Sequence, residues 1–130
     1  METYELQNWN KVIYCVSEVY CATNLYKSAE ADRICSKIRK NVVSLSVSVN
    51  KLSLQGIRYN YSRLYPVLST VYVVKAYLQL AKKFGFIDEV DELDGKLSDI
   101  RDNLLEIIGL EKKKLENMME QEVYETSTSL

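Results

Sequence analysis

Histidine is absent from this 130-residue sequence, which also has only one proline and four glycines. Without histidine, a Ser-His-Asp or Cys-His nucleophile is excluded, and the commonest zinc ligand is missing. The scarcity of turn residues argues against a β-sandwich, which needs a turn signal about every 8–12 residues. No apolar run approaches the roughly 18 residues of a membrane span, and the N-terminus METYELQNWNK has no signal-peptide h-region. We therefore expect one helical domain that does not associate with a membrane.

The three cysteines, Cys15, Cys21 and Cys35, form no C-x-x-C pair. Their odd number favours reduced structural thiols, and hence a cytoplasmic protein without metal or cofactor. The sequence contains no P-loop, no G-x-G-x-x-G and no E-x-x-H motif. These absences favour a protein that is not an enzyme.

Apolar residues at three-four spacing predict four amphipathic helices, at about 4–27, 29–54, 60–84 and 88–122. Asp88 is the predicted N-cap of the fourth helix. Pro66 requires either a cap near Ser62, so that it lies in a first turn, or a bend near Tyr65. Short connections then predict an all-α, up-down-up-down antiparallel four-helix bundle over residues 1–122, followed by a disordered tail at 123–130.

The stretch VVSLSVSVN at residues 42–50 conflicts locally with this assignment. Valine and leucine alternate with serine over about eight residues, which is the period of a half-buried β-strand. The helical register covers a longer segment, from Ile34 through Val42 and Leu45 to Leu52. Because the longer periodicity includes the alternating stretch, we predict a helix here.

Charge is segregated along the chain. Residues 1–84 contain twelve Lys/Arg and five Asp/Glu, for a net charge of +7, whereas residues 85–130 contain five and thirteen, for −8. Between Arg33 and Ile87 there are ten basic residues and no acidic one. In an antiparallel bundle, basic residues of the second and third helices meet at one end. The predicted basic-end residues are Arg33, Lys37, Arg39, Lys40, Lys75, Lys82 and Lys83.

Three interpretations of the basic end remain open. Its cations are solvated or paired internally with the acids that begin the fourth helix, they bind nucleic acid through phosphates, or they bind an acidic protein. Lys51, Arg58 and Arg63 collect at the opposite end.

Ten tyrosines are many for this length, and Tyr61, Tyr65 and Tyr72 form a second stripe on the third helix. This stripe is either a boundary layer whose hydroxyls reach water or a subunit interface, in which tyrosine is enriched.

The segment YLQLAKKFGFID resembles the end of the third helix in a family of small bacterial four-helix-bundle proteins. The family includes proteins encoded in 23S ribosomal RNA intervening sequences and the accessory variability proteins (Avd) of diversity-generating retroelements. The resemblance extends back through SKIRKNVVSLSVSVN and, more weakly, forward through LSDIRDNLLEII, over about 80 residues. The residues that carry it are Leu78, Leu80, Ala81, Phe84, Gly85, Phe86 and Ile87.

Two departures separate the branches of this family. Intervening-sequence proteins usually carry Asn-Ile-Ala-Glu-Gly at the end of the second helix, where this chain has residues 48–52, SVNKL. They also have glutamates in the third helix, where this chain has Val73 and Lys75. The basic residue at Lys75 and the following L-x-L-A-K run are more similar to the accessory variability branch.

The resemblance to that branch implies a ring-like homopentamer of bundles without catalytic residues. Such a ring associates with a reverse transcriptase and with RNA or DNA during mutagenic copying. The alternative is an intervening-sequence-like structural protein whose charge asymmetry serves self-assembly or protein–protein contacts.

Overall fold

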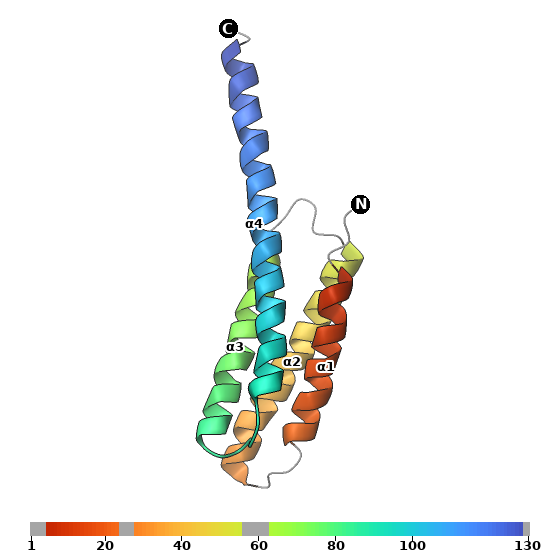
Figure 1. The fold of residues 1–130 in the computed structure, drawn as a ribbon, viewed down its shortest axis with the longest axis vertical. Coiled ribbons are helices and arrows are strands. Elements are labelled where there is room, and N and C mark those ends of the chain that lie inside the picture. The colour runs from red at the N-terminus through yellow and green to blue at the C-terminus, as the bar shows by residue number, and fades with distance from the viewer. Residues whose placement is uncertain (1–4, 24–27, 56–62, 129–130) are drawn as a thin grey trace.

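The computed structural model describes residues 5–23, 28–55 and 63–128 of the chain (Figure 1). All regular structure in these ranges is helical, and no strand occurs in them. The prediction of an all-α chain with four helices is therefore confirmed. The helices are α1 (Glu5–Thr23), α2 (Ala29–Gln55), α3 (Leu64–Lys83) and α4 (Asp91–Thr128).

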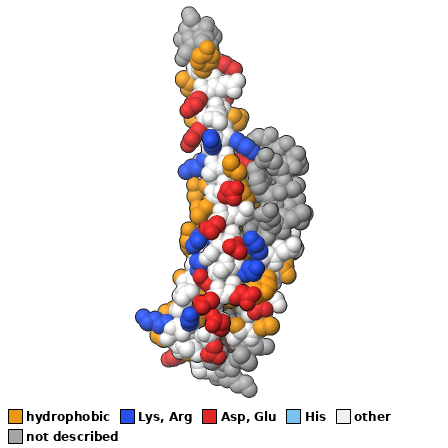
Figure 2. Space-filling view, viewed as in Figure 1, with side chains coloured by type: hydrophobic (Ala, Val, Ile, Leu, Met, Phe, Trp, Pro, Cys, Tyr) orange, Lys and Arg blue, Asp and Glu red, His pale blue; other side chains and the backbone are white. Residues whose placement is uncertain are grey.

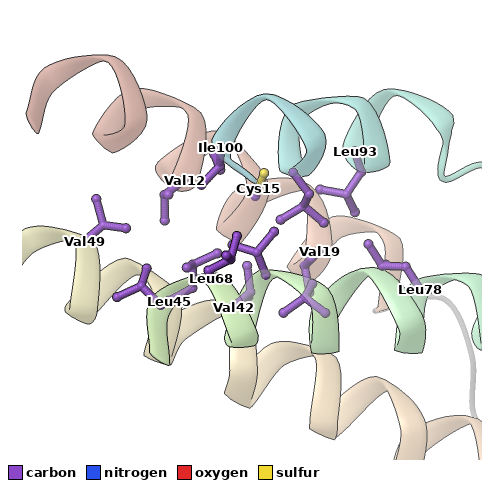
Figure 3. Close-up of a cluster of buried hydrophobic side chains, with 14 of the residues drawn as sticks. Val12, Cys15, Val19, Val42, Leu45, Val49, Leu68, Leu78, Leu93 and Ile100 are labelled. Carbon is purple, nitrogen blue, oxygen red and sulfur yellow. The ribbon is translucent and has the colours of Figure 1, made fainter. Parts of the chain in front are cut away.

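Each helix packs against two others, and consecutive helices run in opposite directions (Figure 1). Helix α1 contacts α2 and α4, and α3 contacts the same two helices, so α2 and α4 occupy opposite corners of the bundle. One continuous apolar core lies between the four helices (Figure 3). This arrangement gives every helix one face toward the core and one face toward the surface.

The valine-serine stretch lies within α2, as predicted from the longer periodicity. A strand would place Val43 and Val47 on the same face as Leu45. Instead, Leu45 is fully buried with Val42, whereas Val43 and Val47 are 38% and 48% exposed. Burial every third or fourth residue is the pattern of a helix with one face on the core.

Helix α3 begins later than predicted, and this accommodates its proline. Because the helix starts at Leu64, Pro66 lies in the first turn, where backbone N–H groups have no intrahelical acceptor. Arg63 occupies the N-cap position without a side-chain cap, and the alternative cap Ser62 lies outside the described residues.

A Schellman turn ends α3. The N–H of Phe86 donates to the carbonyl of Ala81 (2.8 Å), and the N–H of Gly85 donates to that of Lys82 (3.0 Å). Gly85 has φ +74°, a conformation in which a β-carbon is strained.

The predicted N-cap at Asp88 is wrong, because α4 begins three residues later at Asp91. The intervening segment buries Ile87 and Val90 against the core before the helix starts. The carboxylate of Glu89 accepts a hydrogen bond from the Asp91 N–H at 3.0 Å and so satisfies a free donor of the first turn.

At its other end, α4 continues to Thr128, through most of the segment predicted to be a disordered tail. After Gly109 the sequence contains no glycine or proline, and Glu, Lys, Leu, Met and Gln, all strong helix formers, make up most of it. The first helix, predicted to reach residue 27, is described to Thr23, and residues 24–27 lie outside the described ranges.

Candidate functional site

Arg39 does not belong to a free basic surface. Its Nε donates to the Thr23 hydroxyl at 2.6 Å, and its Nη2 donates to the Thr23 carbonyl at 2.7 Å. The guanidinium also stacks over the Tyr20 ring, 5.6 Å from its centroid. The Thr23 hydroxyl in turn donates to the Val19 carbonyl at 2.7 Å. Arg39 therefore holds the end of α1, where free carbonyls and the helix dipole favour a cation.

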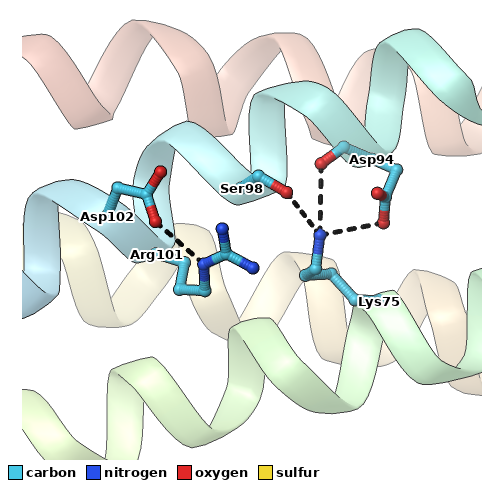
Figure 4. A network of polar contacts seen from close by, with 5 residues as sticks. All are labelled: Lys75, Asp94, Ser98, Arg101 and Asp102. Atoms are coloured by element: carbon cyan, nitrogen blue, oxygen red, sulfur yellow. Dashed lines mark hydrogen bonds and ion pairs between the residues drawn. The ribbon is translucent and has the colours of Figure 1, made fainter.

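Lys75 is also used within the fold (Figure 4). Its ammonium forms an ion pair with the Asp94 carboxylate at 3.0 Å and donates to the Ser98 hydroxyl at 2.5 Å. Only 15% of the Lys75 side chain is exposed. The structure thus gives Lys75 the role of joining α3 to α4.

The end of α3 carries two further cations, both exposed. Lys82 approaches Asp91 at 3.4 Å, and an exposed pair of this kind contributes little, about 0–1 kcal/mol. Lys83 is exposed and has no ion-pair partner within the described ranges. Of the predicted basic-end residues, Lys75 is therefore paired with an acid that begins α4, and Lys82 is paired with one only weakly. Acidic side chains gather over the beginning of α4 (Figure 2).

The remaining predicted cations share the outer face of α2. Arg33, Lys37 and Lys40 are exposed, and their four-three spacing places them one above the other. The Lys37 ammonium lies 5.8 Å from the centroid of the Tyr77 ring on α3. In the part of the chain that the structure describes, Arg33 and Lys40 have no acidic partner.

Lys51 extends this set toward the other end of α2, the end at which its sequence position predicts it to collect with Arg58 and Arg63. It is exposed and lies eleven residues, or about three turns, beyond Lys40, on the same helix face. We call Arg33, Lys37, Lys40 and Lys51 the α2 basic row. The row spans about 27 Å, and α2 carries no acidic residue after Asp32.

A hollow of about 270 Å³ lies beside the first residue of the row. Ile34, Phe84 and Phe86 form its apolar lining, and Glu30 and Arg33 provide its charged groups. The two phenylalanine rings are 5.9 Å apart between centroids. The hollow could not be predicted from the sequence, because its lining comes from segments about 50 residues apart.

The tyrosine stripe is only partly described. Tyr65 and Tyr72 are 42% and 47% exposed on the outer face of α3, while Tyr61 lies outside the described residues. Val73 and Leu80 on the same helix, and Phe84 directly after it, add exposed apolar surface. Half-exposed rings are compatible with either a boundary layer or a subunit contact.

The cysteines are free thiols in the described structure: Cys15 and Cys35 are buried, and Cys21 is exposed. Burial raises the pKa of Cys15 to about 12 and also raises the pKa of Cys35, so both remain protonated at neutral pH. In the described ranges, no three cysteine or acidic side chains are grouped so that they could hold a metal ion.

Comparisons with protein-family models, with curated proteins and with solved structures find no match to this chain. Within the described ranges, none of the helices combines the length and apolar character needed to cross a membrane.

Proposed function

We propose that this chain is a non-enzymatic accessory protein of a diversity-generating retroelement. In this proposal it is a homopentameric, ring-like platform that binds a reverse transcriptase and RNA or DNA in the cytoplasm. The α2 basic row is the observation that supports nucleic-acid binding: it is exposed and about 27 Å long, and α2 carries no acidic residue after Asp32. The resemblance described above supplies the polymerase partner and the number five.

The row suits a phosphate backbone better than a small anion. Its cations are spread along a helix rather than converging on one point, so each can meet a different phosphate and release counterions. Such contacts position a nucleic acid without reading its sequence. The hollow lined by Phe84 and Phe86 places aromatic surface beside Arg33, where an unstacked base of a single strand can lie.

A ring would repeat the row once in each copy. Linked copies bind one strand at high effective concentration, so weak individual contacts give strong retention. The exposed tyrosines and aliphatic side chains of α3 are the proposed surface for subunit or polymerase contacts.

A second candidate is a structural bundle protein, like those of intervening sequences, in which charge serves assembly only. The ion pairs of Lys75 with Asp94 and of Lys82 with Asp91 favour it, because they neutralise part of the basic end within one chain. A reverse-transcriptase gene beside this one favours the first candidate, and a ribosomal RNA operon favours the second.

The experiment is native mass spectrometry with a short structured RNA across a salt series. The accessory-protein proposal expects a pentamer that retains RNA at low salt and loses it steeply as salt rises. A pentamer indifferent to RNA supports the second candidate, and a monomer contradicts both.

Paired charge reversals locate the contact. Lys37→Glu with Lys40→Glu should abolish retention at moderate salt and leave helicity intact, because both side chains are exposed. Lys82→Glu with Lys83→Glu is the matched control, with the same change of charge off the row. Equal loss of retention in both variants would place binding at the end shared by α2 and α3 and contradict the row.

A further inference from the structure

Helix α4 extends well beyond the rest of the bundle (Figure 1). Its last buried residue is Glu111, and every residue from Lys112 to Thr126 is exposed. We call residues 112–128 the α4 overhang. At 1.5 Å per residue, it is about 25 Å long.

The overhang has an apolar face without a partner in the described structure. Leu115, Met118 and Met119 are 44%, 57% and 58% exposed, and Val123 is 66% exposed. Their spacing places them on one side of the helix, in line with the buried stripe that ends at Ile108. Most of the stability of a helix in a protein comes from packing of its apolar face, so contact across this face would stabilise the overhang.

The charges of the overhang favour one geometry for self-pairing. Lys112, Lys113 and Lys114 occupy its beginning, and the acids Glu116, Glu120, Glu122 and Glu125 follow. Parallel pairing of two copies sets lysines against lysines and acids against acids. Antiparallel pairing about Met118 and Met119 sets the lysines of each copy opposite residues 123–125 of the other, within reach of Glu122 and Glu125.

We propose that the α4 overhang docks on the same segment of a second copy as an antiparallel two-helix pair. The apolar face supplies the contact, and the reversed order of charges selects the partner and the direction. Two such segments bury less than a standard interface, so this pair forms in a concentration-dependent way. The contact is separate from the α2 basic row and does not require nucleic acid.

Charge-swapped variants test the pairing by sedimentation velocity. The acidic variant is Lys112→Glu, Lys113→Glu and Lys114→Glu, and the basic variant is Glu120→Lys, Glu122→Lys and Glu125→Lys. Each alone should lose the concentration-dependent step that the wild type shows, and an equimolar mixture should restore it. A wild type without this step, single variants that keep it, or a mixture that fails to restore it would overturn the proposal.

Met118→Ser with Met119→Ser provides a second test with little risk to folding, because both side chains are exposed. It should remove the same association step and leave RNA retention unchanged. Retention lost together with association would contradict the independence of the two surfaces. An unchanged association step would overturn the role of the apolar face.

Disulfide trapping tests the direction, in a Cys21→Ser background because Cys21 is the exposed native thiol. A Met118→Cys variant should cross-link between copies under mild oxidation, since antiparallel pairing brings the centre of each segment together. A Tyr124→Cys variant should not, because residue 124 lies opposite residue 113 of the other copy and its two sulfurs are therefore about 16 Å apart along the pair. Three outcomes would contradict the proposal. Cross-linking of both variants indicates parallel pairing, and cross-linking of Tyr124→Cys alone indicates another register. Cross-linking of neither variant indicates that the segments do not pair.

Discussion

Arg39 and Thr23 illustrate how individual residues connect the helices of this bundle. The two hydrogen bonds from the guanidinium satisfy a hydroxyl and a carbonyl of a threonine that is almost fully buried. A buried polar group without a partner costs free energy. Loss of this contact should therefore destabilise the fold by more than the net contribution of two hydrogen bonds. Lys75 plays the corresponding role between α3 and α4 through Asp94 and Ser98.

Replacing the guanidinium should therefore destabilise the fold. We expect Arg39→Ala to lower the free energy of unfolding by about 1–3 kcal/mol, because Thr23 loses both bonds. The measurement is urea unfolding followed by circular dichroism. The neighbouring Lys40→Ala, at an exposed position, should change stability by no more than about 0.5 kcal/mol. Equal effects of the two substitutions would contradict this role for Arg39.

The buried thiol of Cys15 should make stability depend on alkaline pH. Burial raises its pKa from 9.0 to about 12, so the folded state holds this proton more tightly than the unfolded chain does. The associated stability is complete below pH 9 and is lost as the pH rises from 9 toward 12. A hydrogen bond with Glu92 raises the pKa of Tyr14 to about 12 and adds a loss of the same sign above pH 10.

Urea unfolding at several pH values between 8 and 11 measures this slope. Cys15→Ala should make the decline with pH shallower, whatever its effect at neutral pH. A slope that Cys15→Ala does not alter would show that this thiol is not the titrating group.

At the scale of elements, the ends of α3 and α4 depend on backbone geometry that apolar spacing does not reveal. Gly85 has φ +74° in the turn after α3, whereas Gly95 lies inside α4 with a negative φ, and an added β-carbon at either position meets nothing within 4 Å. The two glycines therefore differ in backbone conformation and not in available space.

Opposite effects are expected when each becomes alanine. Gly85→Ala should destabilise the protein by about 1 kcal/mol, because an L-residue is strained at this φ. Gly95→Ala should stabilise it by about 0.5–1 kcal/mol, because alanine loses less entropy in a helix. Thermal unfolding of the two variants measures these effects. A shift of the melting temperature in the same direction for both would contradict the different backbone conformations of the two glycines.

Helix identity was predictable from the sequence because it depends on periodicity over many residues. The register from Ile34 to Leu52 outweighed the local alternation, and Leu45 and Val49 are buried as a helix requires. The start of α4 was not predictable in this way. Asp88 has the chemistry of an N-cap, but burial of Ile87 and Val90 delays the helix.

The sequence predicts the candidate site only for those cations whose exposure follows from their spacing along a single helix. Arg33, Lys37 and Lys40 follow from their spacing, and the same spacing rule also gives Lys51. The partners of Arg39 and Lys75 lie 16 and 19 residues away in the sequence, on other helices. Without the packed fold, nothing in the sequence distinguishes these two cations from the exposed ones.

For the whole molecule, the packed bundle and the α4 overhang should differ in local stability. Amides of residues 93–108 lie in a helix that packs on the core, whereas residues 112–126 bury no side chain. We expect hydrogen exchange at low protein concentration to be fast in the overhang and slow in the bundle. At high concentration, pairing should slow exchange in the overhang. Slow exchange at both concentrations would show that the overhang is stabilised within one copy.

Because α2 and α4 occupy opposite corners of the bundle, the α2 basic row and the acids that begin α4 lie on different sides of the molecule. The separation of these two groups contributes a component of the electric dipole moment that points from the start of α4 toward the α2 basic row, although the net charge of the chain is only −1. In the field of a polyanion, this component of the dipole moment orients the α2 side toward the polyanion before any contact forms. The fraction of productive encounters should then exceed that of a bundle with the same charges evenly distributed, and the excess should decline as salt shortens the screening length.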